Sequence, residues 1–197
     1  MSDLGFVGLG AIGGAIAERL LTQKHRLRVY DINADALTRL VDLGASNGQS
    51  CMELSAGCEI VFLSLPSPEV VEHVVLGQSG LLSQSKKLRY IVDLSTNSPQ
   101  LSRKISAAAE QVGVNYLDAP VSGGRAGAKK GTLSVMIGGS ASAFEAIKPI
   151  ILGLGANIFH VGPSGSGSLA KLVNNQIFLS TSIVVQEAFM MGLKAGM

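Results

Sequence analysis

The stretch Gly8-Leu9-Gly10-Ala11-Ile12-Gly13 lies between an apolar run, Leu4 to Val7, and a segment with helical periodicity, Ile12 to Leu21. In such a strand–turn–helix context the first glycine permits a tight turn, the second lets the backbone approach a pyrophosphate, and the third allows close helix packing. Unpaired N–H groups and the dipole at a helix start favour phosphate. The motif alone could be only a glycine-rich turn, but its context predicts a dinucleotide site formed by Gly8, Leu9, Gly10, Ala11, Ile12 and Gly13.

Asp31 follows the second apolar run, Leu27 to Tyr30, and it provides the acidic residue that the glycine fingerprint requires about 20 residues later. Its carboxylate would accept hydrogen bonds from the adenosine ribose hydroxyls and repel a 2′-phosphate, and Ile32 supplies no cation for such a phosphate. The sequence therefore favours NAD over NADP. In an alternative interpretation Asp31 caps the helix that begins at Ala34, a role that Asn33 could also fill.

Short apolar runs alternate with helical stretches along the chain, and the runs have the length and branched content of buried parallel strands. Repeated strand–helix–strand units imply a parallel sheet with helices on both faces. We therefore predict an α/β fold with a Rossmann-type, doubly wound, mostly parallel sheet. The expected strands are residues 4–7, 27–30, 60–65, 90–92, 115–119, 133–137 and 157–161. The expected helices are residues 12–21, 34–43, 68–76, 98–111 and 141–152, and residues 120–131 are expected to form a loop.

The C-terminal part of the chain lacks the alternation of strands and helices that is predicted for the rest. The glycine- and serine-rich cluster from Gly162 to Ser168 predicts a short hinge between an NAD-binding domain, residues 1–164, and a second unit, residues 165–197. From Leu169 onward the sequence predicts one long helix without a convincing cap, whose apolar residues surround most of the circumference and indicate burial on several sides. Gln186 and Glu187 interrupt it, so no membrane span is expected. We expect a homo-oligomer through this helix, or packing against a second domain.

Composition narrows the functional classes. With 47% hydrophobic residues, 15% charged residues and a net charge of +2, the chain has the composition of a globular α/β protein and no nucleic-acid or membrane partner is expected. Cys51 and Cys58 form no CxxC pair and have no histidines at ligand spacing, so no metal is expected. The first residues lack the positive segment of a signal peptide, which favours a cytoplasmic location.

Three later segments carry further chemistry: DLSTNSP at 93–99, DAPVSGG at 118–124 and GSGSLAKLVNN at 165–175. Together with the N-terminal GFVGLGAIGG, they resemble the β-hydroxyacid dehydrogenases, which include 3-hydroxyisobutyrate dehydrogenase and tartronate semialdehyde reductase. The resemblance runs from Leu4 onward. It implies an NAD-dependent oxidoreductase that interconverts a small 3-hydroxy acid and its semialdehyde by hydride transfer. Because that family continues with an all-helical domain, it also implies a truncated chain with NAD binding but weak or no turnover.

The residues in these segments have their own interpretation. Thr96 follows a strand, where its hydroxyl could meet the nicotinamide, although it could instead cap the helix near Ser98. Leu65 and Pro66 complete the predicted cofactor-binding set. The substrate is expected to carry a carboxylate, and the turn of N–H groups and a hydroxyl at Ser122, Gly123 and Gly124 could hold it, although a connecting turn is the alternative.

Lys171 is the predicted catalytic residue, because a positioned ammonium can protonate the carbonyl oxygen in reduction and the amine can take the proton in oxidation. The resemblance supports this role, since Lys171 matches the family's lysine motif, whereas an isolated helical lysine is usually only solvated. Asn175 lies one helical turn further on the same face and could orient the substrate. A non-catalytic dinucleotide-binding or oligomerisation module and an imine reductase-like enzyme are the alternatives. Some non-catalytic relatives have lost this lysine, and imine reductases generally lack it.

Overall fold

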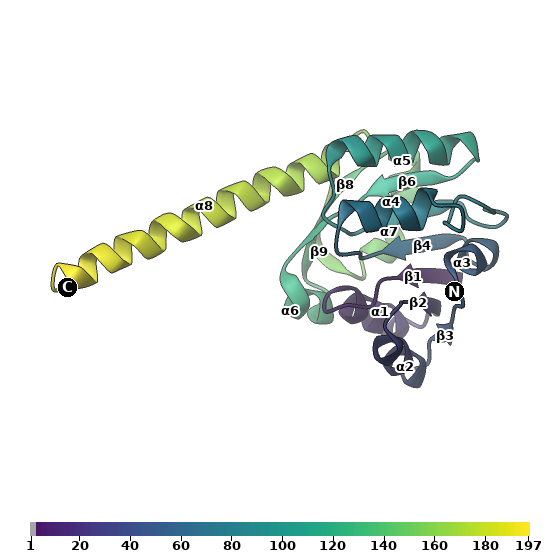
Figure 1. The fold of residues 1–197 in the computed structure, drawn as a ribbon, viewed down its shortest axis with the longest axis horizontal. Helices are drawn as coiled ribbons and strands as arrows, with labels where there is room; N and C mark the ends of the chain where they lie inside the picture. Colours follow the sequence, from purple (N-terminus) through teal and green to yellow (C-terminus); the bar gives the residue numbers. More distant parts are fainter. Residues whose placement is uncertain (1–2) are drawn as a thin grey trace.

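The computed structural model describes residues 3–197, and within them the chain forms one mixed sheet flanked by helices, followed by a long helix that projects from it (Figure 1). The strands are β1 Asp3–Val7, β2 Arg26–Tyr30, β3 Ser46–Asn47, β4 Ile60–Leu63, β5 Tyr90–Asp93, β6 Asn115–Asp118, β7 Val121–Ser122, β8 Leu133–Gly138 and β9 Gly155–Gly162. The helices are α1 Gly13–Thr22, α2 Ala34–Asp42, α3 Cys51–Gly57, α4 Pro68–Leu76, α5 Pro99–Gln111, α6 Gly124–Lys130, α7 Ala141–Ile151 and α8 Ser166–Lys194.

The strand order is β3-β2-β1-β4-β5-β6-β8-β7, with β9 paired to β8. Strands β1 to β6 are parallel, whereas β8 runs antiparallel to β6 and β7. The order reverses between β1 and β4, which creates the crevice where ligands bind in doubly wound sheets. The predicted mostly parallel, doubly wound α/β sheet is therefore confirmed.

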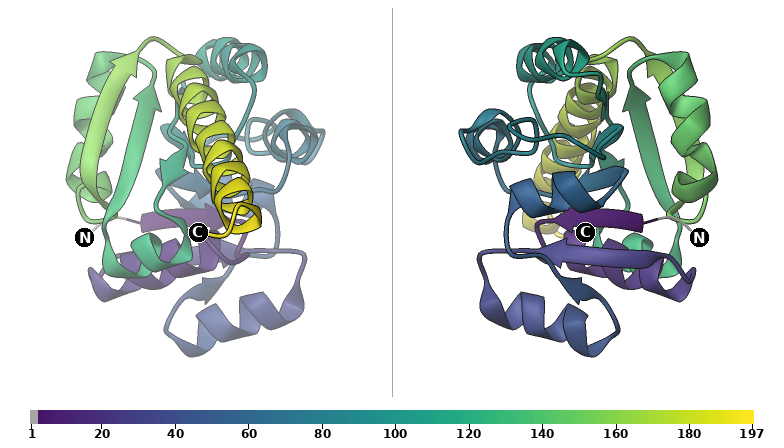
Figure 2. Two further views of the ribbon diagram at one scale, coloured as in Figure 1. Left: turned by 90° about the vertical axis from the view of Figure 1, so that its left-hand side faces the viewer. Right: turned by 90° about the vertical axis from the view of Figure 1, so that its right-hand side faces the viewer.

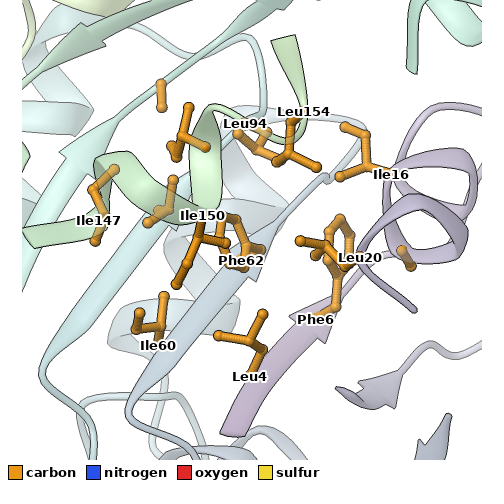
Figure 3. Packing of buried hydrophobic residues seen from close by; sticks show 14 of the residues in the cluster. Leu4, Phe6, Ile16, Leu20, Ile60, Phe62, Leu94, Ile147, Ile150 and Leu154 are labelled. Atoms are coloured by element: carbon orange, nitrogen blue, oxygen red, sulfur yellow. The ribbon is translucent and has the colours of Figure 1, made fainter. Parts of the chain in front are cut away.

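Two apolar clusters fill the two faces of the sheet. Leu4 and Phe6 of β1 pack with Ile60 and Phe62 of β4 beneath α1 and α7 (Figure 3). Alternate residues of the same strands, including Val61, face α3, α4 and α5. Strands that are buried on both faces have nearly continuous apolar sequences, which is why they could be predicted from the sequence. Figure 2 shows the helices on both sides of the sheet.

Helix α8 differs from every other helix in its surroundings. Its first turns contact β8, β9 and α5, and the rest extends away from the sheet, so the C-terminus lies far from the sheet (Figure 1). Of its 29 residues, only Gly167, Ser168 and Lys171 are buried. By length and composition alone it could cross a membrane, since an 18-residue window of the helix has a mean hydropathy of 1.3. The burial expected from its apolar circumference is therefore not supplied by residues 3–197.

Several segments depart from the sequence-based expectation, among them the short strand β3, which was not predicted. The expected loop at 120–131 instead contains β7 and α6, because Gly123 and Gly131 adopt positive φ values of 127° and 70° at the two ends of the short helix. Helix α3 was not predicted, although Ser50 caps it by accepting a hydrogen bond from Glu53 N–H at 3.2 Å. Strand β4 ends at Leu63 rather than Leu65, and the chain then turns into the candidate site.

Candidate functional site

The glycine turn between β1 and α1 has the geometry that close backbone packing demands. Gly8 has φ +93°, and a Cβ on Gly8 or Gly13 would lie less than 3.0 Å from backbone oxygens, those of Ser64 and Gly8 respectively. A Cβ on Gly10 would meet nothing within 4 Å. Two glycines thus hold the turn against the sheet, and the third faces open space.

The start of α1 leaves its donors available. Ile12 stands at the N-cap and no side chain caps the helix. Within residues 3–197, the N–H groups of Gly10, Ala11 and Ile12 donate to no protein acceptor. These unpaired donors and the positive end of the helix dipole fit the phosphates of a dinucleotide.

Asp31 stands at the end of β2 and points back to the glycine turn. Its Oδ2 accepts a hydrogen bond from Leu9 N–H, and its Oδ1 accepts one from Asn33 N–H at 2.7 Å. Asn33 caps α2 by accepting from Asp35 and Ala36 N–H at 3.0 and 3.1 Å. The capping role that the sequence allowed for Asp31 thus belongs to Asn33.

A cavity of about 520 Å³ lies over the glycine turn, within the size range of small-molecule sites. Eight of the predicted cofactor residues line it: Gly8, Gly10, Ala11, Ile12, Gly13, Asp31, Leu65 and Pro66. Leu9 does not, because its side chain is buried in the core and only its N–H reaches Asp31. Sequence reasoning missed the apolar part of the lining, which includes Tyr30, Ala36, Val70 and Val74.

A second cavity of about 730 Å³ adjoins the first and shares with it Ile12, Ser64, Leu65 and Pro66. It collects the remaining predicted residues from three distant segments: Thr96, Ser122, Gly123, Gly124, Lys171 and Asn175. Sequence reasoning missed Ser64, Leu94, Ser95, Val121, Asn174 and Phe178, which also line it. Helical spacing from Lys171 could have found Asn174 and Phe178, since they lie three and seven residues further on.

Lys171, on α8, lines this second cavity. The residue is only 9% exposed, and no carboxylate in residues 3–197 forms an ion pair with it. Desolvation lowers the pKa of its ammonium below the ordinary lysine value of 10.5. A lowered pKa makes the ammonium a stronger proton donor and enlarges the fraction of neutral amine, and general acid–base chemistry uses both forms.

Buried hydrogen bonds fix the loop that carries Thr96. Asp93 Oδ1 accepts from Ser95 N–H at 3.0 Å, and its Oδ2 accepts from Tyr116 O–H at 2.7 Å. Ser95 Oγ in turn accepts from Leu65 N–H at 2.9 Å, which joins this loop to the loop after β4. Ser98 caps α5 by accepting from Leu101 N–H, so the capping role considered for Thr96 falls to Ser98.

Comparisons with known proteins agree with this geometry. The family model for the NAD binding domain of 6-phosphogluconate dehydrogenase matches residues 3–162. Two proteins of Pseudomonas aeruginosa, a 3-hydroxyisobutyrate dehydrogenase and an NAD-dependent L-serine dehydrogenase, are each 40% identical over all 197 residues, and the chain covers 66% of each. It thus spans about two thirds of the length of these relatives.

The structure of Mycobacterium tuberculosis 3-hydroxyisobutyrate dehydrogenase with L-serine superposes with a TM-score of 0.92 at 32% identity. The match covers 100% of this chain and 66% of that one, so the projecting α8 is part of the shared fold. The chain therefore belongs to the 3-hydroxyisobutyrate dehydrogenase family, of which it contains the N-terminal NAD-binding domain.

Proposed function

We propose that this chain provides the cofactor site and the proton-transferring lysine of a dehydrogenase that interconverts a small 3-hydroxy acid and its semialdehyde. The observation that carries the proposal is the position of Lys171. This buried lysine, without a carboxylate partner among residues 3–197, lines a cavity that shares four residues with the cavity over the glycine turn. A merely solvated lysine would lie outside both.

In this proposal Lys171 is the group that takes up and returns the proton. When bound, a nicotinamide cofactor supplies or accepts the hydride. In oxidation the neutral Lys171 amine takes the hydroxyl proton, and in reduction the ammonium returns a proton to the carbonyl oxygen. The lowered pKa of Lys171 makes its ammonium a stronger acid and enlarges the fraction of neutral amine that can take up a proton.

The turn from Ser122 to Gly124, which lines the same cavity as Lys171, suits a carboxylate. Gly123 and Gly124 have φ values of 127° and 61°, a conformation that glycine adopts readily and that exposes backbone donors. The Ser122 hydroxyl and the Asn175 amide add uncharged donors to the same cavity. The set fixes a small carboxylate by hydrogen bonds, without an arginine among the lining residues.

Asp31 supports NAD as the preferred cofactor. It lines the first cavity beside Ile32 and Asn33, and neither lysine nor arginine lines that cavity. A 2′-phosphate would therefore meet a carboxylate and no cation. Calorimetric titration of the chain with NAD⁺ and NADP⁺ tests this preference. We expect tighter binding of NAD⁺, and equal affinities would refute the role of Asp31.

Turnover is best tested in a chimaera in which residues 1–197 replace the matching two thirds of the P. aeruginosa 3-hydroxyisobutyrate dehydrogenase. We expect NADH formation with small 3-hydroxy acids and little with the corresponding alcohols that lack the carboxylate, whereas the 197-residue chain alone gives weak or no turnover. A chimaera that binds NAD⁺ but oxidises none of these acids would support the alternative, a non-catalytic dinucleotide-binding module.

A further inference from the structure

Asp118, the last residue of β6, connects this strand to the start of α8. Its side chain is buried, and its two carboxylate oxygens accept hydrogen bonds from the start of α8. Oδ1 accepts from Gly165 N–H and Oδ2 from Ser168 N–H, each at 2.8 Å. These donors are the N-cap and third-residue amides of α8, which are unpaired in any helix without a cap.

The bonds form a helix cap that is supplied from a distant strand. The N-cap residue of α8 is Gly165, with φ +90° and no capping side chain of its own. A carboxylate at this end also faces the positive end of the helix dipole. The sequence around the start of this helix offers no convincing cap, and none of its own side chains provides one. The cap comes instead from a residue 47 to 50 positions earlier in the chain.

Close packing around Asp118 holds the first turn of α8 in place. A Cβ on Gly167 would lie less than 3.0 Å from the carbonyl oxygens of Asp118 and Met136, and a Cβ on Gly138 would lie 2.6 Å from Asp118 Oδ1. On the other side, the hydroxyl of Ser168 hydrogen-bonds that of Ser102 in α5 at 2.9 Å. Backbone and side chains thus seat α8 directly against β6 and β8.

We propose that Asp118 is a positioning residue for the proposed dehydrogenase site, because it fixes the start of the lysine-bearing helix relative to the substrate-binding turn. Lys171 lies three residues after Ser168, and Ser122 lies four residues after Asp118. A shift of the first turn of α8 would therefore move the Lys171 amine relative to the Ser122 turn, while the cofactor cavity, which Asp118 does not line, would keep its shape.

The test compares Asp118→Asn with Asp42→Asn, a matched change at an exposed position of α2. The side-chain amide that Asp118→Asn introduces keeps one acceptor oxygen but sets an N–H₂ group against the second backbone donor. In the 197-residue chain we expect about tenfold faster amide hydrogen exchange or more at Gly165 or Ser168. We also expect the NMR-measured pKa of Lys171 to change, whereas NAD⁺ affinity stays unchanged and Asp42→Asn behaves as wild type.

The turnover measurement rests on the proposed function, whereas exchange, pKa and cofactor affinity do not. In the chimaera, Asp118→Asn should lower kcat for the hydroxy acid by about tenfold or more and leave the KM for NAD⁺ unchanged. If the unmodified chimaera is inactive, the proposed function fails while the amide and pKa measurements still decide the role of Asp118. Faster exchange with an unchanged Lys171 pKa and an unchanged kcat would reduce Asp118 to a structural cap and overturn the proposal.

A second variant covers the case in which Asp118→Asn does not fold. Gly167→Ala keeps the carboxylate but places a methyl group against the backbone of β6 and β8, so it displaces the same turn of α8. We expect the same change in the pKa of Lys171 and the same loss of kcat, with NAD⁺ affinity retained. Wild-type values of both quantities in Gly167→Ala would contradict the positioning role.

Discussion

The backbone N–H groups at the starts of α1 and α8 have different surroundings. The N–H groups of Gly10, Ala11 and Ile12, which lead into α1, border a cavity and have no protein acceptor within residues 3–197, whereas those of Gly165 and Ser168 of α8 donate to the buried carboxylate of Asp118. At both ends the first backbone donors have no partner within the helix, and both ends carry the positive end of the helix dipole. An open end is suited to a diffusible anion, and a filled end fixes the helix that follows. The contrast assigns cofactor binding to α1 and side-chain positioning to α8.

The largest effect expected from this contrast is the loss of turnover without loss of binding. In the chimaera, Lys171→Ala should reduce kcat by about 10²–10⁴, because it removes the general acid–base group, and it should leave NAD⁺ affinity unchanged. Lys194→Ala, an exposed lysine at the other end of α8, is the control and should keep full activity. If the Lys171→Ala variant kept the wild-type kcat, Lys171 would not be the general acid–base group.

The converse effect is expected at α1. Gly13→Ala brings a methyl group against backbone and should destabilise the fold by about 1–3 kcal/mol. Gly10→Ala adds a methyl group where nothing lies within 4 Å, so stability should persist while NAD⁺ affinity falls by about tenfold. Chemical denaturation and calorimetry separate the two variants. A Gly10→Ala chain that binds NAD⁺ normally would show that the phosphates lie elsewhere.

A third prediction concerns the far part of α8. Its exposed apolar side chains include Ile183 and Phe189, and burial of each such side chain is worth about 1.5–3 kcal/mol. We expect the chain to self-associate through this helix, and we expect the Ile183→Glu, Phe189→Glu double variant to be monomeric. Light scattering measures both. A wild-type chain that stays monomeric at high concentration would contradict the prediction.

The smallest effect is a gain in stability. Because desolvation lowers the folded-state pKa of Lys171, the unfolded chain binds more protons there, and the stability that this lysine contributes above pH 10.5 is lost as the pH falls through the folded pKa. Lys171→Met should therefore raise Tm at neutral pH, with a smaller gain near pH 10.5. A Tm that is lower than wild type at neutral pH would contradict this linkage.

Local patterns predicted most of the fold, and distant contacts explain what they missed. The glycine turn, Asp31 and the helical spacing of Lys171 and Asn175 are readable because each signal lies within a few residues or at a fixed period. The cap of α8 could not be predicted from the sequence, because Asp118 lies 47 to 50 residues before the amides that it binds. Nothing in the residues around Asp118 indicates that it caps a helix. Helix α6 was missed because its glycines, which end the helix, also resemble those of a loop.

The central claim is that the turn leading into α1 presents its amides to the cofactor, whereas the first amides of α8 are bound by Asp118. It can be tested for each amide separately. We propose to titrate the ¹⁵N-labelled chain with NAD⁺ and to follow the N–H resonances of Gly10, Ala11 and Ile12 beside those of Gly165 and Ser168. The account predicts large shifts at the first three and protected, nearly unchanged amides at the last two. Binding that leaves Gly10 to Ile12 unperturbed would contradict it.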